Sequence, residues 1–288
     1  MPAVGPGMRR GLREGLPLLP FLVFVGIFLI VPTVTVIVGA FYLDGQFSLQ
    51  RIGALFSPTA LTALWRSVLL SASTAAFGAV FGAQLAWLIV RRPATSVLRR
   101  GVLSLCSVLA QFGGVALAFA FLATIGLNGV LTVWVVEHFG WNLTGNGWLY
   151  GLPGLILVYT YFQIPLMVIV FLPALEGLRA QWREAAVSLG ASTWQYWREV
   201  GFPLLRPAFL GSALLLFANA FAAYATAAAL VSQGSPIVPL LIRSALTSEI
   251  VLGQAGFAYA LALEMIVVVA VVMIAYNVLV RRTARWLQ

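Results

Sequence analysis

The sequence predicts an all-α membrane protein with six transmembrane helices and both termini in the cytoplasm. Of its 288 residues, 61% are hydrophobic and 9% are charged, whereas soluble domains are about 45–50% apolar and about 25% charged. Six stretches reach the length of about 20 apolar residues that a bilayer core about 30 Å thick requires. The loops between these stretches also differ sharply in their arginine content.

Each predicted span lacks a run of charged residues and is bounded by polar, glycine-rich or arginine-bearing segments. In chain order the spans are Leu16–Tyr42, Leu61–Val90, Gly101–Ile125, Leu152–Leu175, Pro207–Val231 and Gln254–Val280. In the second span, Gly78 and Gly82 are four residues apart, a spacing that permits close approach of a neighbouring helix. We expect residues 1–288 to form a single transmembrane domain.

The arginines fix the orientation of these spans. With the N-terminus inside, fourteen arginines are cytoplasmic and three are outside, as the positive-inside rule requires. The cytoplasmic arginines are Arg9, Arg10, Arg13, Arg91, Arg92, Arg99, Arg100, Arg179, Arg183, Arg198, Arg206, Arg281, Arg282 and Arg285, and the outer ones are Arg51, Arg66 and Arg243. Arginines placed in this way contact lipid headgroups. We therefore attribute the net positive charge of the chain to its membrane surface and not to binding of nucleic acid.

The composition excludes several kinds of chemistry. The chain contains no lysine, and a phosphate-binding P-loop requires one. Cys106 is the single cysteine and His138, in an outer loop, the single histidine, which leaves no cysteine-rich metal site and no intramembrane nucleophile–base pair. We therefore expect no catalytic residue, metal or cofactor in this chain.

The cytoplasmic loop Glu176–Arg206 is too polar to span a membrane and too regular to be a slack linker. Residues Gln181–Leu189 are predicted to form a short helix, which Gly190 ends because glycine adopts the left-handed conformation cheaply. A second helix starts at Ser192 with the spacing of a capping box to Gln195.

Pro203 and Pro207 are predicted to stop the second helix before the fifth span, because proline removes a backbone donor. Small residues and aromatics on this loop suit a docking element for another protein. An amphipathic element lying on the bilayer fits the same residues equally well. The residues in question are Ala185, Ala186, Trp194, Tyr196 and Trp197.

Part of this loop resembles the EAA motif of bacterial ATP-binding-cassette importer permeases. The sequence Glu184-Ala185-Ala186, three residues, Gly190, nine residues, Val200-Gly201-Phe202-Pro203 keeps both gaps of the family pattern. It departs from that pattern at Val200 and Phe202, where the family has Ile and Leu. The resemblance extends over about residues 61–279 and is strongest to permeases for polyamine, phosphonate, iron and thiamine.

The resemblance implies a type I importer fold in the bacterial cytoplasmic membrane. It implies a second permease subunit, identical or different, two ATPase subunits that bind ATP and Mg²⁺, and an extracytoplasmic substrate-binding protein. Glu184, Ala185, Ala186, Gly190, Val200, Phe202 and Pro203 would couple the chain to the ATPases. The cargo would be a small solute such as a polyamine, with phosphonate, thiamine and ferric ion as alternatives.

Glu264 lies about ten residues into the last span, and a charged carboxylate there costs roughly 2.5–3.5 kcal/mol. It either lines a translocation path, where it contacts a cationic cargo, or stays protonated and bonds to a neighbouring helix. Asn219 and Tyr224 in the fifth span are weaker candidates for the path. An uncoupled channel, a secondary transporter and an intramembrane enzyme are the alternatives from other classes, and none of them explains the loop.

Overall fold

The computed structural model describes residues 18–43, 46–231, 237–247 and 254–284, almost entirely as helices. The α-helices are α2 (Leu19–Val25), α3 (Val31–Phe41), α4 (Gln50–Gly53), α5 (Pro58–Val90), α6 (Val97–Gln111), α7 (Gly114–Ile125), α8 (Val130–Phe139), α9 (Leu152–Glu176), α10 (Ala180–Ser188), α11 (Thr193–Tyr196), α12 (Phe202–Ala222), α13 (Ala225–Leu230), α14 (Val238–Thr247) and α15 (Gln254–Ala284). A π-helical turn, Gly26–Ile30, joins α2 to α3, and two-residue strands β1 (Tyr42–Leu43) and β2 (Gln46–Phe47) pair antiparallel.

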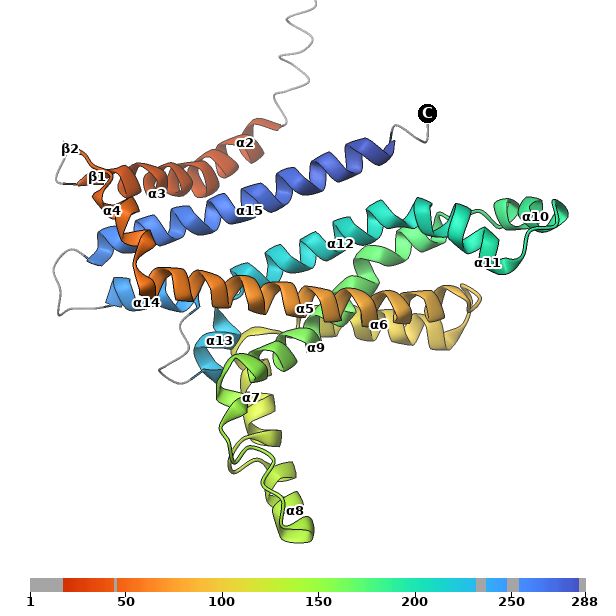
Figure 1. The fold of residues 1–288 in the computed structure, drawn as a ribbon, viewed down its shortest axis with the longest axis horizontal. Helices are drawn as coiled ribbons and strands as arrows, with labels where there is room; N and C mark the ends of the chain where they lie inside the picture. The colour runs from red at the N-terminus through yellow and green to blue at the C-terminus, as the bar shows by residue number, and fades with distance from the viewer. Residues whose placement is uncertain (1–17, 44–45, 232–236, 248–253, 285–288) are drawn as a thin grey trace, which may run out of the picture.

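Helices α5, α12 and α15 run along the length of the molecule and give it two distinct ends (Figure 1). The helices α10 and α11 and the connection between α5 and α6 lie at one end, and β1, α4 and α14 lie at the other. The first end is the one that the arginines assign to the cytoplasm. The predicted cytoplasmic residues Arg9, Arg10, Arg13 and Arg285 lie outside the described residues.

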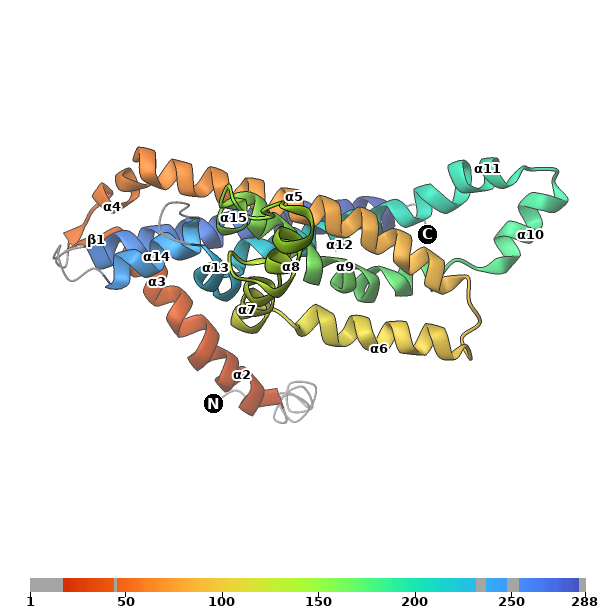
Figure 2. The same ribbon diagram turned by 90° about the horizontal axis from the view of Figure 1, so that it is seen from below.

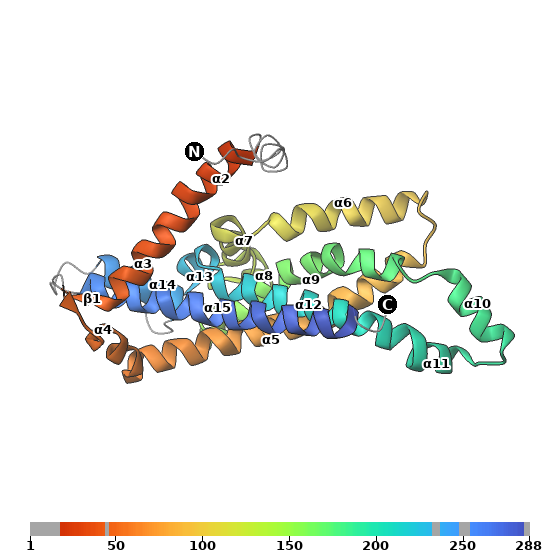
Figure 3. The same cartoon turned by 90° about the horizontal axis from the view of Figure 1, so that it is seen from above.

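Helix α5 packs along α9 through glycine (Figure 3). A Cβ atom on Gly78 would lie 2.7 Å from Cβ of Gln163, and one on Gly82 would lie 2.5 Å from Cβ of Met167. Both distances are far below van der Waals contact. The two glycines therefore permit the closest approach of the helices, as their spacing predicts.

Six stretches of the described residues are long and apolar enough to cross a membrane, but two predicted spans are wrong as continuous helices. The predicted Gly101–Ile125 is interrupted between α6 and α7, where Gly114 has φ +72°. The predicted Pro207–Val231 is interrupted between α12 and α13. The third candidate span instead runs over Gly114–Phe139, and its helices α7 and α8 project sideways from the bundle (Figure 1).

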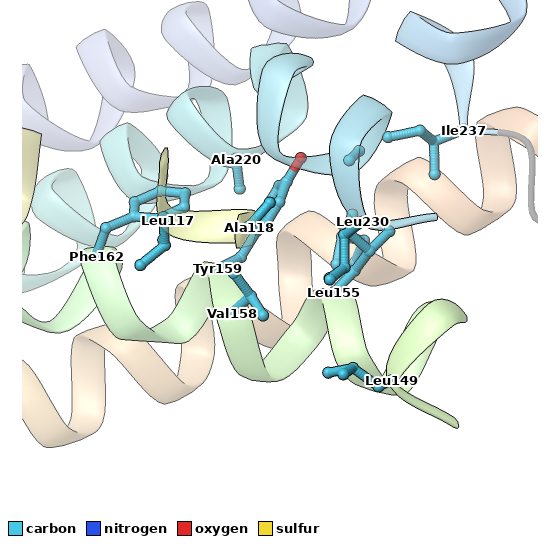
Figure 4. Packing of buried hydrophobic residues seen from close by; sticks show 12 residues of the cluster. Leu117, Ala118, Leu149, Leu155, Val158, Tyr159, Phe162, Ala220, Leu230 and Ile237 are labelled. Carbon is cyan, nitrogen blue, oxygen red and sulfur yellow. The ribbon is translucent and has the colours of Figure 1, made fainter. Parts of the chain in front are cut away.

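The two interruptions lie together, and side chains satisfy the backbone groups that they free. The Gly114 N–H donates to the hydroxyl of Thr226 at 2.9 Å, and the buried Tyr159 hydroxyl donates to the carbonyl of Ala223 at 2.9 Å (Figure 4). Irregular backbone is tolerated at membrane depth only where it is satisfied in this way. No pattern along the chain marks these partners, because they are more than 60 residues apart.

Candidate functional site

The loop between α9 and α12 extends beyond the bundle as two short helices (Figure 2). The N–H of Gly190 donates to the carbonyl of Val187, and the N–H of Ala191 donates to that of Ala186, both at 2.9 Å. Gly190 has φ +80°. This is a Schellman motif, in which glycine takes the left-handed position. The predicted end of the first helix at Gly190 is confirmed, with helix bounds one residue earlier than predicted.

The second helix begins with the predicted capping box. The Ser192 hydroxyl accepts from the N–H of Gln195 at 3.2 Å, and the Gln195 side chain accepts from the N–H of Ser192 at 2.7 Å. Two backbone donors at the start of the helix are thus satisfied. The turn between α10 and α11 is therefore specified by residues on both of its sides.

The prediction that Pro203 and Pro207 stop this helix is wrong. Residues Trp197–Gly201 form a π-helical turn, in which the Phe202 N–H reaches back to the carbonyl of Trp197. Pro203 has no N–H to donate to the preceding turn, and the wider π-helical turn lets the helix continue past it. The helix therefore continues from Thr193 to Ala222, from the loop into the membrane-spanning part of the chain.

Most residues of the motif lie on the surface of the loop. Glu184 and Ala185 are exposed on α10, Ala186 is half-buried, and Phe202 and Pro203 are exposed where α12 begins. Large apolar side chains beside them are also uncovered, with Leu189 88% and Trp194 72% exposed. This surface combines aromatics and arginines with small residues, a composition that protein interfaces share.

The base of the loop contacts the bundle through a buried tyrosine and an ion pair. Tyr196 is buried and lines a cleft of about 260 Å³ together with residues at the ends of α5 and α9. Arg99 on α6 forms an ion pair with Glu176, the last residue of α9. The sequence gives no sign of this pair, whose members are 77 residues apart. The loop thus has a fixed base and a tip that the chain itself leaves uncovered.

The three candidate path residues come from different segments. Asn219 is exposed on α12, and its amide lies 3.5 Å from the side-chain oxygen of the buried Gln163. Tyr224 is 37% exposed at the break before α13. Glu264 is half-buried on α15, and its Oε2 atom has no hydrogen-bond partner within the described residues. No sequence spacing predicted the hydrogen bond from Gln163 to the Leu216 carbonyl, at 2.7 Å.

The described residues offer little acid–base or metal chemistry. No three His, Cys, Asp or Glu side chains in these ranges are close enough to hold a metal ion. His138 is exposed, stacks on Trp134 and contacts the carbonyl of that residue at 2.8 Å.

Comparison with known families matches almost the whole chain. Residues 16–285 match the family described as binding-protein-dependent transport system inner membrane component. The sulfate transport system permease protein CysW of Escherichia coli (strain K12) is 32% identical over 192 residues, which are 67% of this chain and 62% of that protein. The thiamine transport system permease protein ThiP of Salmonella typhimurium is 30% identical over 44% of this chain and 23% of its own length. The chain thus spans less than two thirds of these relatives.

Solved structures share the fold at lower sequence identity. A bacterial ABC transporter involved in the import of the acidic polysaccharide alginate contains a chain that matches with a TM-score of 0.74, 18% identity and 97% coverage of both chains. A chain of the MetNI methionine ABC transporter matches with a TM-score of 0.57 and 19% identity, over 79% of this chain and 99% of that one. These matches confirm the predicted importer-permease fold.

Proposed function

The chain belongs to the family of binding-protein-dependent transport system inner membrane components, and we propose that it forms the translocation path of an ATP-driven importer. It is a multi-pass protein of the cytoplasmic membrane and a transport subunit rather than an enzyme. The uncovered loop, residues 176–206, is the observation that carries the proposal. Its position at the cytoplasmic end makes it accessible to a separate ATPase subunit (Figure 2).

Membership of this family supports a set of proposed partners. Two copies of the permease, or this chain and a second one, would enclose the path, and each would bind one ATPase that supplies ATP and Mg²⁺ chemistry. A binding protein outside the membrane would deliver the cargo. When the ATPases close, they would draw the two loops together and turn the path outward, as a rigid-body switch between two states.

Within the loop we assign the contact with the ATPase to the exposed residues of the motif. Glu184 offers a carboxylate beside the small Ala185, which lets a partner surface approach. Gly190 sets the angle between α10 and α11. Val200 and Phe202, both exposed, add apolar contact area where the loop joins α12.

Charge reversal at Glu184 tests this assignment. The full-length chain is expressed with the other subunits of its transporter, and the ATPase that co-purifies is quantified by mass spectrometry. Glu184→Arg should reduce the bound ATPase at least tenfold, because an interfacial charge then repels its partner. The matched control Glu137→Arg changes an equally exposed glutamate at the end of α8 and should leave binding unchanged. Equal ATPase binding in wild type and Glu184→Arg would refute the docking role.

For the cargo we propose a small cationic solute such as a polyamine. The support is Glu264, whose Oε2 atom is buried without a protein partner among the described residues. A carboxylate kept in this state inside a membrane protein is expensive unless a cation or a proton compensates it. Thiamine and ferric ion, carried by relatives of the chain, share the positive charge, whereas sulfate and phosphonate do not.

A transport assay in vesicles separates these cargo classes. With the purified binding protein present, uptake of the solute that this protein carries is measured. Added spermidine should reduce this uptake by competition, and added sulfate should not. Glu264→Gln, which removes the charge and keeps the shape, should lower uptake while the amount of protein in the membrane stays constant. Normal uptake by this variant, or uptake of sulfate, would overturn the cationic assignment and leave the importer assignment intact.

A further inference from the structure

A second feature of the cytoplasmic end is a cleft lined by residues at the end of α5 and the start of α6. Its volume is about 480 Å³. Three arginines line it: Arg91, Arg92 and Arg99. The rest of its lining is aliphatic and includes Leu88 and Leu98, which are 54% and 62% exposed. The cleft thus joins concentrated positive charge to an apolar wall.

The three guanidinium groups are placed in different ways. Arg99 pairs with Glu176 and donates to the carbonyl of Arg92 at 3.1 Å. The guanidinium of Arg91 lies 3.9 Å above the ring of Trp87. Arg92 is exposed, and its side chain has no partner within the described ranges. No acidic residue lines the cleft. Within the described residues, Arg99 has an acidic partner, Glu176, and Arg91 and Arg92 have none.

The apolar and basic residues are ordered along the helices. Leu85 is three residues before Leu88 and four before Ile89 on α5, which places the three side chains on one face. Arg91 and Arg92 follow directly after the end of this helix. Leu98 and Val102 are four residues apart on α6 and line the opposite wall. On α5 the aliphatic side chains lie deeper than Arg91 and Arg92, and on α6 Val102 lies one turn deeper than Arg99. Leu98 lies beside Arg99 at the cytoplasmic start of α6. This order matches the order of headgroup and acyl chain in the inner leaflet.

We propose that this cleft is a binding site for one anionic phospholipid of the phosphatidylglycerol class. The headgroup phosphate is held by Arg92, beside the Arg99–Glu176 pair, and one acyl chain runs between Leu88 and Val102. A basic pocket between helices on the cytoplasmic side has the chemistry that recognises acidic headgroups. A zwitterionic lipid would bring its ammonium group against Arg91 and Arg92, neither of which has an acidic partner within the described residues. A free phosphate would leave the apolar wall exposed to water.

Titration of lipid onto the delipidated full-length chain in detergent tests the proposal. Native mass spectrometry measures the binding of phosphatidylglycerol, and phosphatidylcholine with the same acyl chains is the control lipid. The first phosphatidylglycerol should bind more tightly than phosphatidylcholine. Arg92→Gln should weaken it about fivefold, the effect expected for one arginine near an acidic surface. The matched variant Arg100→Gln removes an exposed arginine on α6 that does not line the cleft, and it should bind lipid as the wild type does.

Three results would overturn the site. Equal losses in Arg92→Gln and Arg100→Gln would show that a diffuse positive surface attracts the lipid. Equal binding of the two lipids would show that the headgroup is not recognised. Displacement of phosphatidylglycerol by millimolar inorganic phosphate would identify a site for free phosphate. The Arg92 side chain makes no hydrogen bond or ion pair within the described residues. In the absence of lipid, Arg92→Gln should therefore have the elution volume and the melting temperature of the wild type, so that a difference in lipid binding reports on the cleft.

Discussion

Gly190 offers the cleanest test of how the loop is shaped. Its φ of +80° lies in the left-handed region, and a Cβ atom placed on it would meet nothing within 4 Å. A larger residue there therefore causes no clash. Any effect of substitution must come from the backbone conformation, which sets the angle between α10 and α11.

The size of the effect can be worked out from that conformation. A residue other than glycine costs about 1–2 kcal/mol in the left-handed region, which reduces the population of the native turn by a factor of roughly 5–30. Valine, which is β-branched, should be worse than alanine. Asparagine tolerates this region and should retain most of the native turn. If the ATPase binds the native turn alone, its affinity falls by the same factor.

The assay measures binding of the purified ATPase to the permease, together with uptake in vesicles. Gly190→Val should weaken binding about five- to thirtyfold, and Gly190→Asn should be close to the wild type. Gly140→Val is the matched control, because Gly140 also has a positive φ, +67°, and open space around it, at the end of α8. Wild-type binding by Gly190→Val, or equal losses in valine and asparagine variants, would refute the reasoning.

Three further predictions concern stability, measured by thermal unfolding in detergent. Gly82→Ala should destabilise the chain because the new methyl group overlaps α9. Gly101→Ala, in open space on α6, should stabilise the chain by about 0.5–1 kcal/mol. The opposite ranking of the two melting temperatures would contradict the packing. Gln163→Leu should cost about 0.6 kcal/mol, the average for a hydrogen bond between membrane helices, and an unchanged melting point would mean that water replaces that bond. A double-mutant cycle on Arg99 and Glu176 should give a coupling of about 0.2–1 kcal/mol, and a zero coupling would mean that the ion pair adds nothing.

Local sequence signals predicted the local parts of the structure. Gly190 as a helix end and Ser192 with Gln195 as a capping box depend on residues within a few positions of each other, and the structure has both. The approach of α5 to α9 through Gly78 and Gly82 also follows from a short spacing. Hydropathy over a longer window similarly predicted six spans.

The interruptions in two spans could not be predicted, because hydropathy does not distinguish a continuous helix from a broken one. The breaks depend on Tyr159 and Thr226, which satisfy backbone groups far away in the sequence. Pro203 gave a misleading signal for a related reason, since a π-helical turn upstream accommodates it. The roles of Glu184 and Glu264 stay predictions, because they depend on a partner and a cargo.

The helix from Thr193 to Ala222 connects the cytoplasmic loop to the membrane interior without a break. A movement of one end of this helix would therefore move the other end. Its 30 residues correspond to about 45 Å at the rise of an α-helix. A tilt of about 10° applied at one end would therefore move the other end by about 8 Å if the helix stayed straight. The helix would bend most easily at the π-helical turn Trp197–Gly201. Removing one residue from that turn would therefore change how much of a displacement of the loop reaches the membrane-spanning end of the helix.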